Sequence, residues 1–370
     1  MKILYVTTVG STMGFFYEHF RMLLAEGCEI ELACGNAKPI SEKIASLGLT
    51  THILSFSRSP MSMDNLKAYK QLKKLIKHGN YDIVHCHTPN ASVITRLACR
   101  KYRKKNNLKV YYTAHGFHFY KGAPKLNWLV YYPIEKFCSR FTDKLITINS
   151  EDYELAKSKF KAKEVHYVPG VGLDLSRFED VQVDKLAKRR EIGVPEDAKL
   201  LFSVGELNEN KNHQVIIRAL AKLNDSNIHY VIAGIGDKKE SLCMLAKELG
   251  IEEQVHLLGF RKDIPELNYI ADVFCFPSYR EGLGLASIEA MSCGLPIITS
   301  NVHGINDYSV DGVTGYKCAP TDVDGFAKAI KKLTSSDLNS KSLMGARNRE
   351  ISKGYDVTQI LPQIINLYFH

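Results

Sequence analysis

Residues Tyr279–Pro296 read YREGLGLASIEAMSCGLP, and this segment carries the most informative pattern in the sequence. We expect an apolar strand before it, over Asp272–Pro277, and another after it, over Ile297–Ser300. The glycines between the first strand and the helix that follows let the backbone turn sharply and approach a ligand closely. Because the helix is expected to start near Gly284, the free N–H groups of its first turn form a site for anions, phosphates above all.

This helix has almost no polar face, since only Ser287, Glu289 and Ser292 interrupt its apolar residues. Such a helix is expected to be buried, and a carboxylate on it is costly unless a polar group pairs with it. A pair of sugar hydroxyls would satisfy Glu289; a hydrogen-bonded structural Glu is the alternative. Glu281 lies eight residues earlier, in the glycine loop, so the two acids have the spacing Glu-x7-Glu.

The Glu-x7-Glu pattern lies in a segment expected to form a strand, a glycine loop and a helix. In this setting it resembles the donor-site motif of retaining glycosyltransferases of family 4, which have the GT-B fold. The resemblance extends over essentially the whole chain. It implies an α/β architecture of two Rossmann-like domains that face each other across a cleft, with the nucleotide sugar bound by the second domain.

Length and composition are consistent with a globular protein of two domains, because 370 residues exceed what one core usually supports. The chain is 45% hydrophobic and 24% charged, has no apolar run of membrane-spanning length, and leads from Met1 straight into a strand without a signal peptide. Nine cysteines scattered singly favour a reducing cytosol over a disulfide framework. We therefore expect a cytoplasmic protein.

Alternation of strands and helices predicts a mostly parallel sheet, covered on both faces, in each half of the chain. The strands expected in the first half are Lys2–Thr8, Ile30–Cys34, His52–Phe56, Asp82–His87, Val110–His115, Lys144–Asn149 and Val165–Val168. Those expected in the second half are Leu200–Val204, His229–Ala233, Val255–Gly259, Val273–Phe276 and Ile297–Ser300.

The alternation of strands and helices breaks once, at a linker region between two domains. With a terminal helix, the chain therefore has four parts. We assign residues 1–169 to an N-terminal Rossmann-like domain that binds the acceptor and a membrane, and residues 170–195 to a linker region. Residues 196–350 are assigned to a C-terminal Rossmann-like domain that binds the nucleotide sugar. Residues 351–370 are expected to form a terminal helix, which in the GT-B fold crosses back to the first domain.

His115 stands where a strand ends and a glycine turn begins, the usual position for a reactive side chain in an α/β sheet. In family 4, a His at this strand end points at the sugar being transferred; a structural His that caps the strand is the other interpretation. The longer stretch His115–Gly122 resembles enzymes of capsule and exopolysaccharide assembly, which use undecaprenyl-diphosphate-linked acceptors.

The resemblance also assigns donor contacts outside the Glu-x7-Glu stretch. Gly14 matches the family's glycine-rich loop, although the usual adjacent glycine pair is absent, and Gly236 matches its Gly-x-Gly turn. Lys211 matches a Lys that faces the donor diphosphate, and Arg261 occupies the position that borders the base. Glu206 departs from the pattern, because the family usually has an Arg there, so another cation must replace that contact.

Two motifs suggest a metal, and neither is complete. His85 and His87 end one strand, where we interpret them as lying on alternate faces and therefore unable to hold one ion. Asp322 and Asp324 form a nominal Asp-x-Asp motif, but they precede a helix, so N-capping is the better interpretation. We expect no metal and no other cofactor.

Charge is divided unequally along the chain. Residues 1–170 hold 26 Lys and Arg against 13 Asp and Glu, a net +13, whereas the remainder holds 23 against 27, a net −4. The excess lies in two basic helices, over Asn65–Lys77 and Arg96–Lys105, and around the aromatic segment Trp128–Pro133. Basic residues beside aromatic ones predict an anionic membrane face as partner, and no recognition module indicates nucleic acid.

The resemblance implies a role for each acid and cation of the donor site. Glu281 should hold the hydroxyls of the transferred sugar, and Glu289 the ribose of the nucleotide. Lys211 and the N–H groups of Leu285 and Ala286 should neutralise the departing diphosphate. In the family, the acceptor hydroxyl attacks the face from which the nucleotide leaves, so the resemblance implies no carboxylate pair of the glycosidase kind.

We thus expect a retaining hexosyl- or N-acetylhexosaminyltransferase that moves a sugar from a UDP-sugar to a hydroxyl of an undecaprenyl-diphosphate-linked sugar. It would act in bacterial surface polysaccharide synthesis, attached peripherally to the inner face of the cell membrane. Two alternatives remain: a sugar-nucleotide epimerase or hydrolase of the same architecture, and a non-catalytic sugar-nucleotide-binding protein, which Glu206 makes conceivable.

Overall fold

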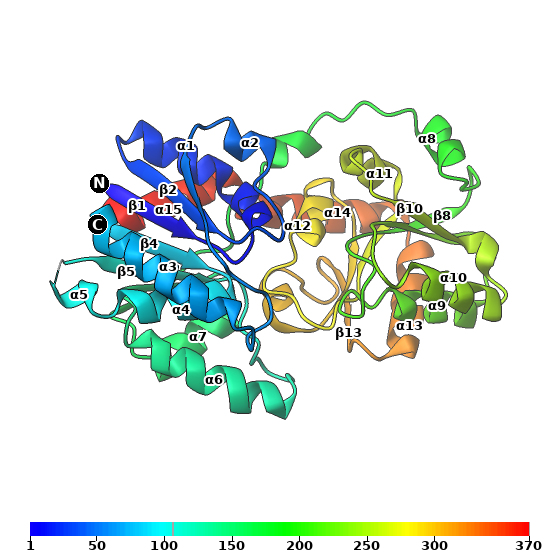
Figure 1. Cartoon of the computed structure of the whole chain (residues 1–370). Helices are drawn as coiled ribbons and strands as arrows, with labels where there is room; N and C mark the ends of the chain where they lie inside the picture. Colours follow the sequence, from blue (N-terminus) through cyan, green and yellow to red (C-terminus); the bar gives the residue numbers. More distant parts are fainter. Residues whose placement is uncertain (106, 370) are drawn as a thin grey trace. The chain divides into compact units, whose positions relative to one another are not determined.

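The computed structural model describes residues 1–105 and 107–369, and the chain divides into two compact units. The first unit consists of residues 1–172 together with the C-terminal residues from 357 onward, and the second consists of residues 173–356. Both units are layered α/β structures in which helices pack on the two faces of a sheet (Figure 1).

The first unit is built on a seven-stranded sheet with the order β3-β2-β1-β4-β5-β6-β7, in which every neighbouring pair is parallel. Its strands are β1 (Lys2–Val6), β2 (Glu29–Cys34), β3 (Thr50–Ile53), β4 (Ile83–His87), β5 (Lys109–Ala114), β6 (Lys144–Thr147) and β7 (Glu164–Tyr167). Its helices are α1 (Tyr17–Ala25), α2 (Glu42–Ala45), α3 (Asp64–Gly79), α4 (Pro89–Cys99), α5 (Tyr102–Lys105), α6 (Lys125–Ser139), α7 (Ser150–Lys159) and α15 (Val357–Phe369).

Two apolar clusters cover the two faces of this sheet. One cluster contains residues of α3, α4 and α7, and the other contains residues of α1 and α15. The central strand β4 is buried over its whole length, because helices press on it from both sides. The strand order changes direction between β1 and β4, and ligands of open α/β sheets bind beyond the carboxyl ends of strands at such a point.

The second unit has a six-stranded parallel sheet with the order β10-β9-β8-β11-β12-β13. Its strands are β8 (Lys199–Val204), β9 (Ile228–Ala233), β10 (Val255–Gly259), β11 (Val273–Phe276), β12 (Ile297–Ser300) and β13 (Gly315–Cys318). Its helices are α8 (Lys185–Glu191), α9 (His213–Leu223), α10 (Lys239–Glu248), α11 (Ile264–Ile270), α12 (Leu285–Ser292), α13 (Val323–Thr334) and α14 (Leu338–Lys353). The order reverses between β8 and β11, which places the loops after these two strands side by side.

The predicted α/β class with two Rossmann-like sheets is confirmed. All the expected strands form; β10, β11 and β12 have the predicted bounds, and the others differ at one or both ends. The largest shift is at β3, which was expected over His52–Phe56 and lies at Thr50–Ile53. The edge strand β13 and the helices α11 and α14 were not expected. The charged segment after Gly172 contains α8, and from Leu173 onward it belongs to the second unit. No helix in the described part of the chain has both the length and the apolar character needed to cross a bilayer.

Candidate functional site

The glycine loop of the Glu-x7-Glu stretch is shaped by one glycine in particular. Gly284 has a φ of 87°, in the left-handed region, and immediately precedes α12. A Cβ at this position would lie 2.5 Å from Cε1 of Phe276 and 2.8 Å from the Tyr308 hydroxyl oxygen, so any side chain would collide with the core. The helix that begins at Leu285 therefore starts directly beyond the end of β11, and the N–H groups of Leu285 and Ala286 belong to its free first turn.

Lys211 and Glu281 form an ion pair, with 2.6 Å between Nζ and Oε1. Lys211 comes from the loop after β8, and Glu281 from the loop after β11, so the adjacent strands bring together residues far apart in sequence. The side chains are only 20% and 15% exposed, and the Lys211 ammonium also lies 4.6 Å from the ring centroid of Phe276. The predicted donor residues Lys211 and Glu281 are thus in direct contact.

Asparagine side chains fasten these two loops together. The Asn212 amide donates to the carbonyl oxygens of Pro277, at 3.0 Å, and Pro320, at 2.8 Å. The Asn210 amide donates to the carbonyl of Arg280 at 3.0 Å, and the N–H of Tyr279 donates to the Asn210 carbonyl at 2.8 Å. The position of Lys211 against Glu281 is therefore fixed by backbone contacts on both sides.

Glu289 lies on α12, about one turn beyond its first residue, in the part-buried position that its apolar helix predicted. Burial raises the pKa of Glu289 to about 7, and Arg177 opposes this rise. The carboxyl group is therefore about half ionised at neutral pH. A ligand that hydrogen-bonds to its ionised form would lower that pKa again.

Around Gly236 the backbone passes close to the loop after β8. A Cβ on Gly236 would lie 2.3 Å from the carbonyl oxygen of Leu207, and one on Gly234 would lie 1.8 Å from that of Gly205. Both glycines of the expected Gly-x-Gly turn are therefore needed for close approach of two backbone segments. Glu206, in the same region, is exposed and accepts a hydrogen bond from the Asn208 amide at 2.9 Å.

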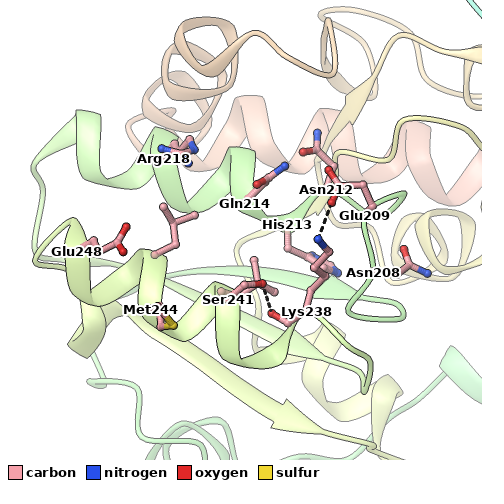
Figure 2. Close-up of a pocket in the computed structure, with 12 residues that line it drawn as sticks. Asn208, Glu209, Asn212, His213, Gln214, Arg218, Lys238, Ser241, Met244 and Glu248 are labelled. Carbon is pink, nitrogen blue, oxygen red and sulfur yellow. Dashed lines mark hydrogen bonds and ion pairs between the residues drawn. The ribbon is translucent and has the colours of Figure 1, made fainter. Parts of the chain in front are cut away.

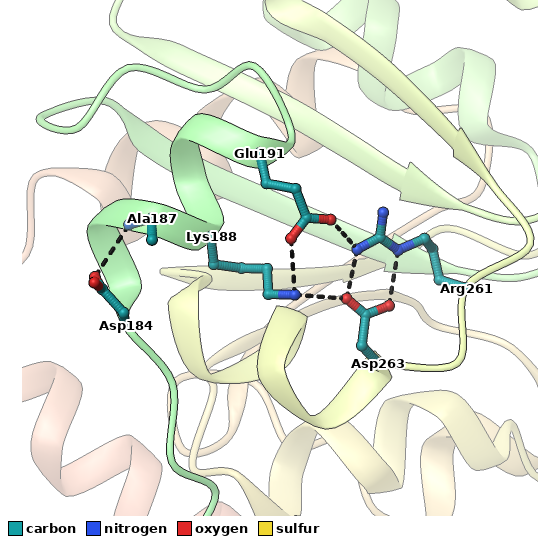
Figure 3. A network of polar contacts seen from close by, with 6 residues as sticks. All are labelled: Asp184, Ala187, Lys188, Glu191, Arg261 and Asp263. Atoms are coloured by element: carbon teal, nitrogen blue, oxygen red, sulfur yellow. Dashed lines mark hydrogen bonds and ion pairs between the residues drawn. The ribbon is translucent and has the colours of Figure 1, made fainter.

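The guanidinium of Arg261 takes part in an ion-pair network with α8 (Figure 3). It lies 2.5 Å from Glu191 and 2.5 Å from Asp263, and Lys188 pairs with both of these carboxylates at 2.9 Å. Arg261 and Lys188 together hold the pKa of Asp263 well below its usual range. Beside this network, the side chain of Phe260 is exposed. At this strand end, therefore, the guanidinium is occupied by carboxylates and the neighbouring aromatic ring is accessible.

A pocket of about 310 Å³ lies against α9 and α10, and Asn208 and Asn212 of the loop after β8 also line it (Figure 2). Its lining includes His213, Arg218 and Ser241, and the ion pair of Lys238 with Glu209, 2.9 Å long, lies at its edge. None of the predicted donor residues lines it. The strand-end loops, and not this pocket, therefore gather the predicted chemistry.

In the first unit, His115 follows the end of β5 and precedes Gly116, which has a φ of 110°. Its Nε2 lies 3.1 Å from Nδ1 of His87, at the end of the adjacent strand β4. Burial lowers the pKa of His115 to about 4, and it lowers the pKa of His87 strongly as well, so both rings are neutral at pH 7.

The predicted placement of His85 and His87 on alternate faces of the strand is wrong. Residues two apart in a strand share a face, and the two rings are 4.2 Å apart between centroids. Nε2 of His85 is bonded to the Thr113 hydroxyl at 2.8 Å, and its Nδ1 is bonded to the hydroxyl of Tyr368 on α15. Across residues 1–105 and 107–369, no three or more His, Cys, Asp or Glu side chains are grouped so as to hold a metal ion.

Two further predictions concern local structure. Asp322 caps α13, as predicted, by accepting a hydrogen bond from the Gly325 N–H at 2.8 Å, and Asp324 pairs with Lys222. Gly14 is exposed, in a 3₁₀ helix over Gly10–Phe16, and a Cβ there would meet only the Ser41 hydroxyl, at 3.9 Å. Gly10 is the tightly packed residue of this loop, since a Cβ would lie 2.7 Å from the backbone nitrogen of Ile40.

Two residues near the predicted site were missed by the sequence analysis. His87 was considered only as a metal ligand, although its position one strand away from His115 could have suggested a pair. Arg280 was quoted as part of the motif without a role, and its Nη1 is buried without a hydrogen-bond partner in the described structure. Its place next to Glu281 was the available signal.

Comparison with solved structures identifies the fold class as GT-B. A UDP and glucose complex of HepE from Anabaena matches 100% of this chain and 99% of its own, with a TM-score of 0.80 and 19% sequence identity. Two family models match the sequence: one described as glycosyl transferases group 1, over residues 184–351, and one described as glycosyl transferase 4-like, over residues 2–149.

Two curated relatives resemble the chain over nearly its full length. EpsD of Bacillus subtilis (strain 168), which its name describes as a glycosyltransferase, is 36% identical to this chain. The match covers 99% of this chain and 96% of EpsD. An Escherichia coli galactosyltransferase, which by its name transfers galactose from UDP-Gal to GlcNAc-diphosphoundecaprenol, is 28% identical over 95% and 91%. The chain belongs to the group 1 glycosyltransferases, and the family predicted from the Glu-x7-Glu stretch is confirmed.

Proposed function

We propose that this glycosyltransferase moves a hexose or N-acetylhexosamine, with retention, from a UDP-sugar to a hydroxyl of a sugar on a lipid diphosphate such as undecaprenyl diphosphate. It would serve bacterial surface polysaccharide synthesis. The observation that carries the proposal is the Lys211–Glu281 pair beside the free first turn of α12. The donor and acceptor named for the Escherichia coli relative support the UDP-sugar and the lipid diphosphate.

The charges of this pair suggest how a donor binds. Without a ligand, Lys211 and Glu281 neutralise each other at 2.6 Å. A donor diphosphate competes for the Lys211 ammonium, and the Glu281 carboxylate then becomes available to the hydroxyls of the transferred sugar. As the glycosidic bond breaks, negative charge grows on the diphosphate, where Lys211 and the N–H groups of Leu285 and Ala286 stabilise it.

The remaining donor contacts are assigned in the same way. Glu289, whose carboxyl is about half ionised at neutral pH, accepts the ribose hydroxyls. The unpaired Nη1 of Arg280 makes it our candidate for the cation that Glu206 does not supply. His115 contacts the transferred sugar. At Gly14 and Gly236, the absence of a side chain lets the backbone approach the ligand closely.

Near Arg261, we assign the contacts with the nucleotide base to the backbone and to the exposed ring of Phe260. The Arg261 guanidinium is left to its two carboxylates.

Acceptor-dependent release of UDP tests the proposal. The protein is incubated with UDP-galactose, UDP-glucose or UDP-N-acetylglucosamine, with and without a short-chain lipid-diphosphate sugar, in buffer with EDTA. We expect UDP release from one of these donors only when the acceptor is present, and an α-linked product by NMR. Release without acceptor would identify a hydrolase, interconversion of the donors an epimerase, and binding without turnover a sugar-nucleotide-binding protein. Activity that returns only with a divalent cation would contradict the metal-free site.

A second part of the proposal is attachment to an anionic membrane through one face of the first unit. Here α3, α4 and α6 pack side by side on the sheet (Figure 1). The membrane face consists of the exposed apolar side chains of α6, namely Leu126, Leu129, Val130, Ile134 and Phe137, and of the lysines of α3, namely Lys67, Lys70, Lys73, Lys74 and Lys77. An apolar helix surface flanked by cations suits the boundary between anionic head groups and acyl chains.

Two residues of the segments expected to meet the membrane contact other residues of the first unit. Trp128 packs on Phe119 and Tyr132, and its indole N–H donates to the Tyr120 carbonyl at 3.3 Å, so it is not the principal apolar anchor. Arg96 is fully buried and pairs with Glu135 at 2.8 Å, so it adds nothing to the basic surface. The sequence indicated the charge and apolar content correctly, but not which side chains face solvent.

Replacing Lys70, Lys73, Lys74 and Lys77 by Gln is expected to weaken binding to vesicles that contain an anionic lipid. Each juxtamembrane cation contributes about 1 kcal/mol near such a surface, and salt screens the attraction. In a sedimentation assay, we expect the wild type to pellet at about 0.05 M salt and to be released as salt rises to about 0.5 M. UDP affinity should not change in the variant.

The matched control carries the same loss of charge on α9 and α13 of the second unit, through Lys222→Gln, Lys328→Gln, Lys331→Gln and Lys332→Gln. This control should sediment like the wild type. Equal binding to neutral and anionic vesicles would contradict the electrostatic contribution, and equal loss in both quadruple variants would contradict the membrane face.

A further inference from the structure

His87 and His115 are neighbours at the carboxyl ends of two adjacent strands, and their contact is a hydrogen bond between two imidazoles. The bond joins Nδ1 of His87 to Nε2 of His115 over 3.1 Å. His87 has no assigned role in the reaction, whereas His115 is the residue that we propose to contact the sugar. The structure therefore raises the question of which ring donates.

The ring of His87 is held in one orientation by packing. It is 1% exposed, and the rings of Phe16 and His85 lie 4.2 Å away between centroids. Tyr5 stacks on it at 5.4 Å with an interplanar angle of 13°. With rings on several sides, His87 cannot rotate about its Cβ–Cγ bond, which would carry Nδ1 away from His115, without displacing the core. Its Nδ1 therefore stays directed at His115.

Burial keeps both imidazoles neutral at pH 7, so only one of the two facing nitrogens carries a proton. If His115 donates from Nε2, His87 must carry its own proton on Nε2. That nitrogen is buried and has no hydrogen-bond partner among the described residues. If His87 donates from Nδ1, its Nε2 is left as an unused lone pair.

The second arrangement is favoured, because a buried N–H without an acceptor is rare in proteins and leaving one costs free energy. It has a consequence for the tautomer of His115. When Nε2 of His115 accepts the bond from His87, the single proton of the neutral His115 ring must lie on Nδ1. His115 then presents an N–H donor through Nδ1, suited to a sugar oxygen.

We propose that His87 is a positioning residue that donates its Nδ1 proton to Nε2 of His115 and so fixes His115 as the Nδ1–H tautomer. A histidine that acts on a substrate depends on its second nitrogen for its tautomer and orientation. Only the benefit to sugar transfer rests on the proposed function. The tautomer itself is a property of the ligand-free protein.

Nitrogen-15 NMR of the histidine-labelled protein, without substrates, tests the tautomer directly. The wild type is expected to show His115 protonated on Nδ1 and unprotonated on Nε2. His87→Asn keeps an N–H donor close to the position of Nδ1, so it should keep that pattern, whereas His87→Phe fills the space without a donor and should lose it. An Nε2–H tautomer in the wild type, or an unchanged tautomer in His87→Phe, would overturn the proposal.

Kinetics separates positioning from a packing role. We expect His87→Phe to lower kcat about tenfold, the value of one hydrogen bond, with an unchanged KM for the donor, and His87→Asn to recover most of it. Equal losses in the two variants would indicate packing alone and contradict the proposal. If instead the NMR result holds but His115→Phe retains full kcat, the role of His115 in sugar transfer fails while the tautomer assignment stands.

Discussion

Lys211→Met is expected to lower kcat/KM for the UDP-sugar by about 100- to 1,000-fold, the usual effect of removing one group that stabilises transition-state charge. The substitution removes the only cation paired with Glu281 in the described structure. It also leaves that carboxylate, 15% exposed, beside the position proposed for the diphosphate. Steady-state kinetics with the acceptor, together with calorimetric titration of UDP, would measure the loss.

Lys238→Met is the matched control, because Lys238 lies on the next strand-end loop and pairs with Glu209 at 2.9 Å. This pair is 41% and 65% exposed, and exposed pairs contribute little, so kcat/KM should change by less than about twofold. Similar losses in Lys211→Met and Lys238→Met would contradict a specific role for Lys211 at the diphosphate.

A double-mutant cycle shows whether the pair acts as a unit. Lys211→Met leaves an unpaired carboxylate, and Glu281→Gln leaves an unpaired ammonium, whereas the double variant leaves neither. We expect the double variant to melt at a higher temperature than Lys211→Met, although it should be no more active. Glu281→Gln should mainly lower kcat, because its carboxylate is proposed to hold the transferred sugar. Additive melting-temperature changes would mean that the 2.6 Å contact is energetically irrelevant.

Glu289→Gln is expected to change stability and donor binding in opposite directions at pH 8. Burial raises the pKa of Glu289 from its ordinary value of 4.5 to about 7 in the folded protein. Between pH 4.5 and pH 7, Glu289 is protonated in the folded state and ionised in the unfolded state. The free energy of unfolding therefore decreases as pH rises from 4.5 to 7. Gln carries no charge, so the variant should be more stable at pH 8, by up to roughly 3 kcal/mol.

Donor binding should show the reverse dependence, because an ionised Glu289 is the better acceptor for two ribose hydroxyls. We expect wild-type affinity for a UDP-sugar to fall about tenfold between pH 8 and pH 6, as the carboxylate becomes protonated. Glu289→Gln should bind weakly at both pH values. A UDP-sugar is the suitable ligand, since its diphosphate has no group that titrates in this range.

Glu240→Gln, on the exposed surface of α10 in the same unit, is the control for both measurements and should match the wild type in each. Unchanged UDP-sugar affinity in Glu289→Gln would remove the ribose assignment. Equal unfolding free energies for Glu289→Gln and the wild type at pH 8 would remove the buried-charge argument.

The strand, loop and helix of the proposed donor site could be predicted from sequence because their constraints are local. Gly284 must adopt a positive φ, and the helix after it is apolar on nearly all sides. The eight-residue spacing places Glu281 in the loop and Glu289 on the helix. Each of these features lies within one strand, loop and helix. The family and fold inferred from that stretch are confirmed for the same reason.

The errors concern side-chain direction. His85 and His87 share a face, and Arg96 is buried against Glu135. Composition indicates that a segment is basic or aromatic, but exposure is decided by the elements packed against it. In α6, the ring of Trp128 is directed towards Phe119, which comes from the loop after β5.

Most strands and helices of this protein could be predicted from sequence, because hydrophobic period, glycine positions and helix caps act over a few residues; β13, α11 and α14 could not. Tertiary structure alone decided the contacts that we assign to chemistry. Lys211 meets Glu281 across 70 residues because β8 and β11 are neighbours, and His87 meets His115 across 28 because β4 and β5 are. Strand order in a parallel sheet is set by how the crossover helices pack, a long-range property that local spacing does not contain.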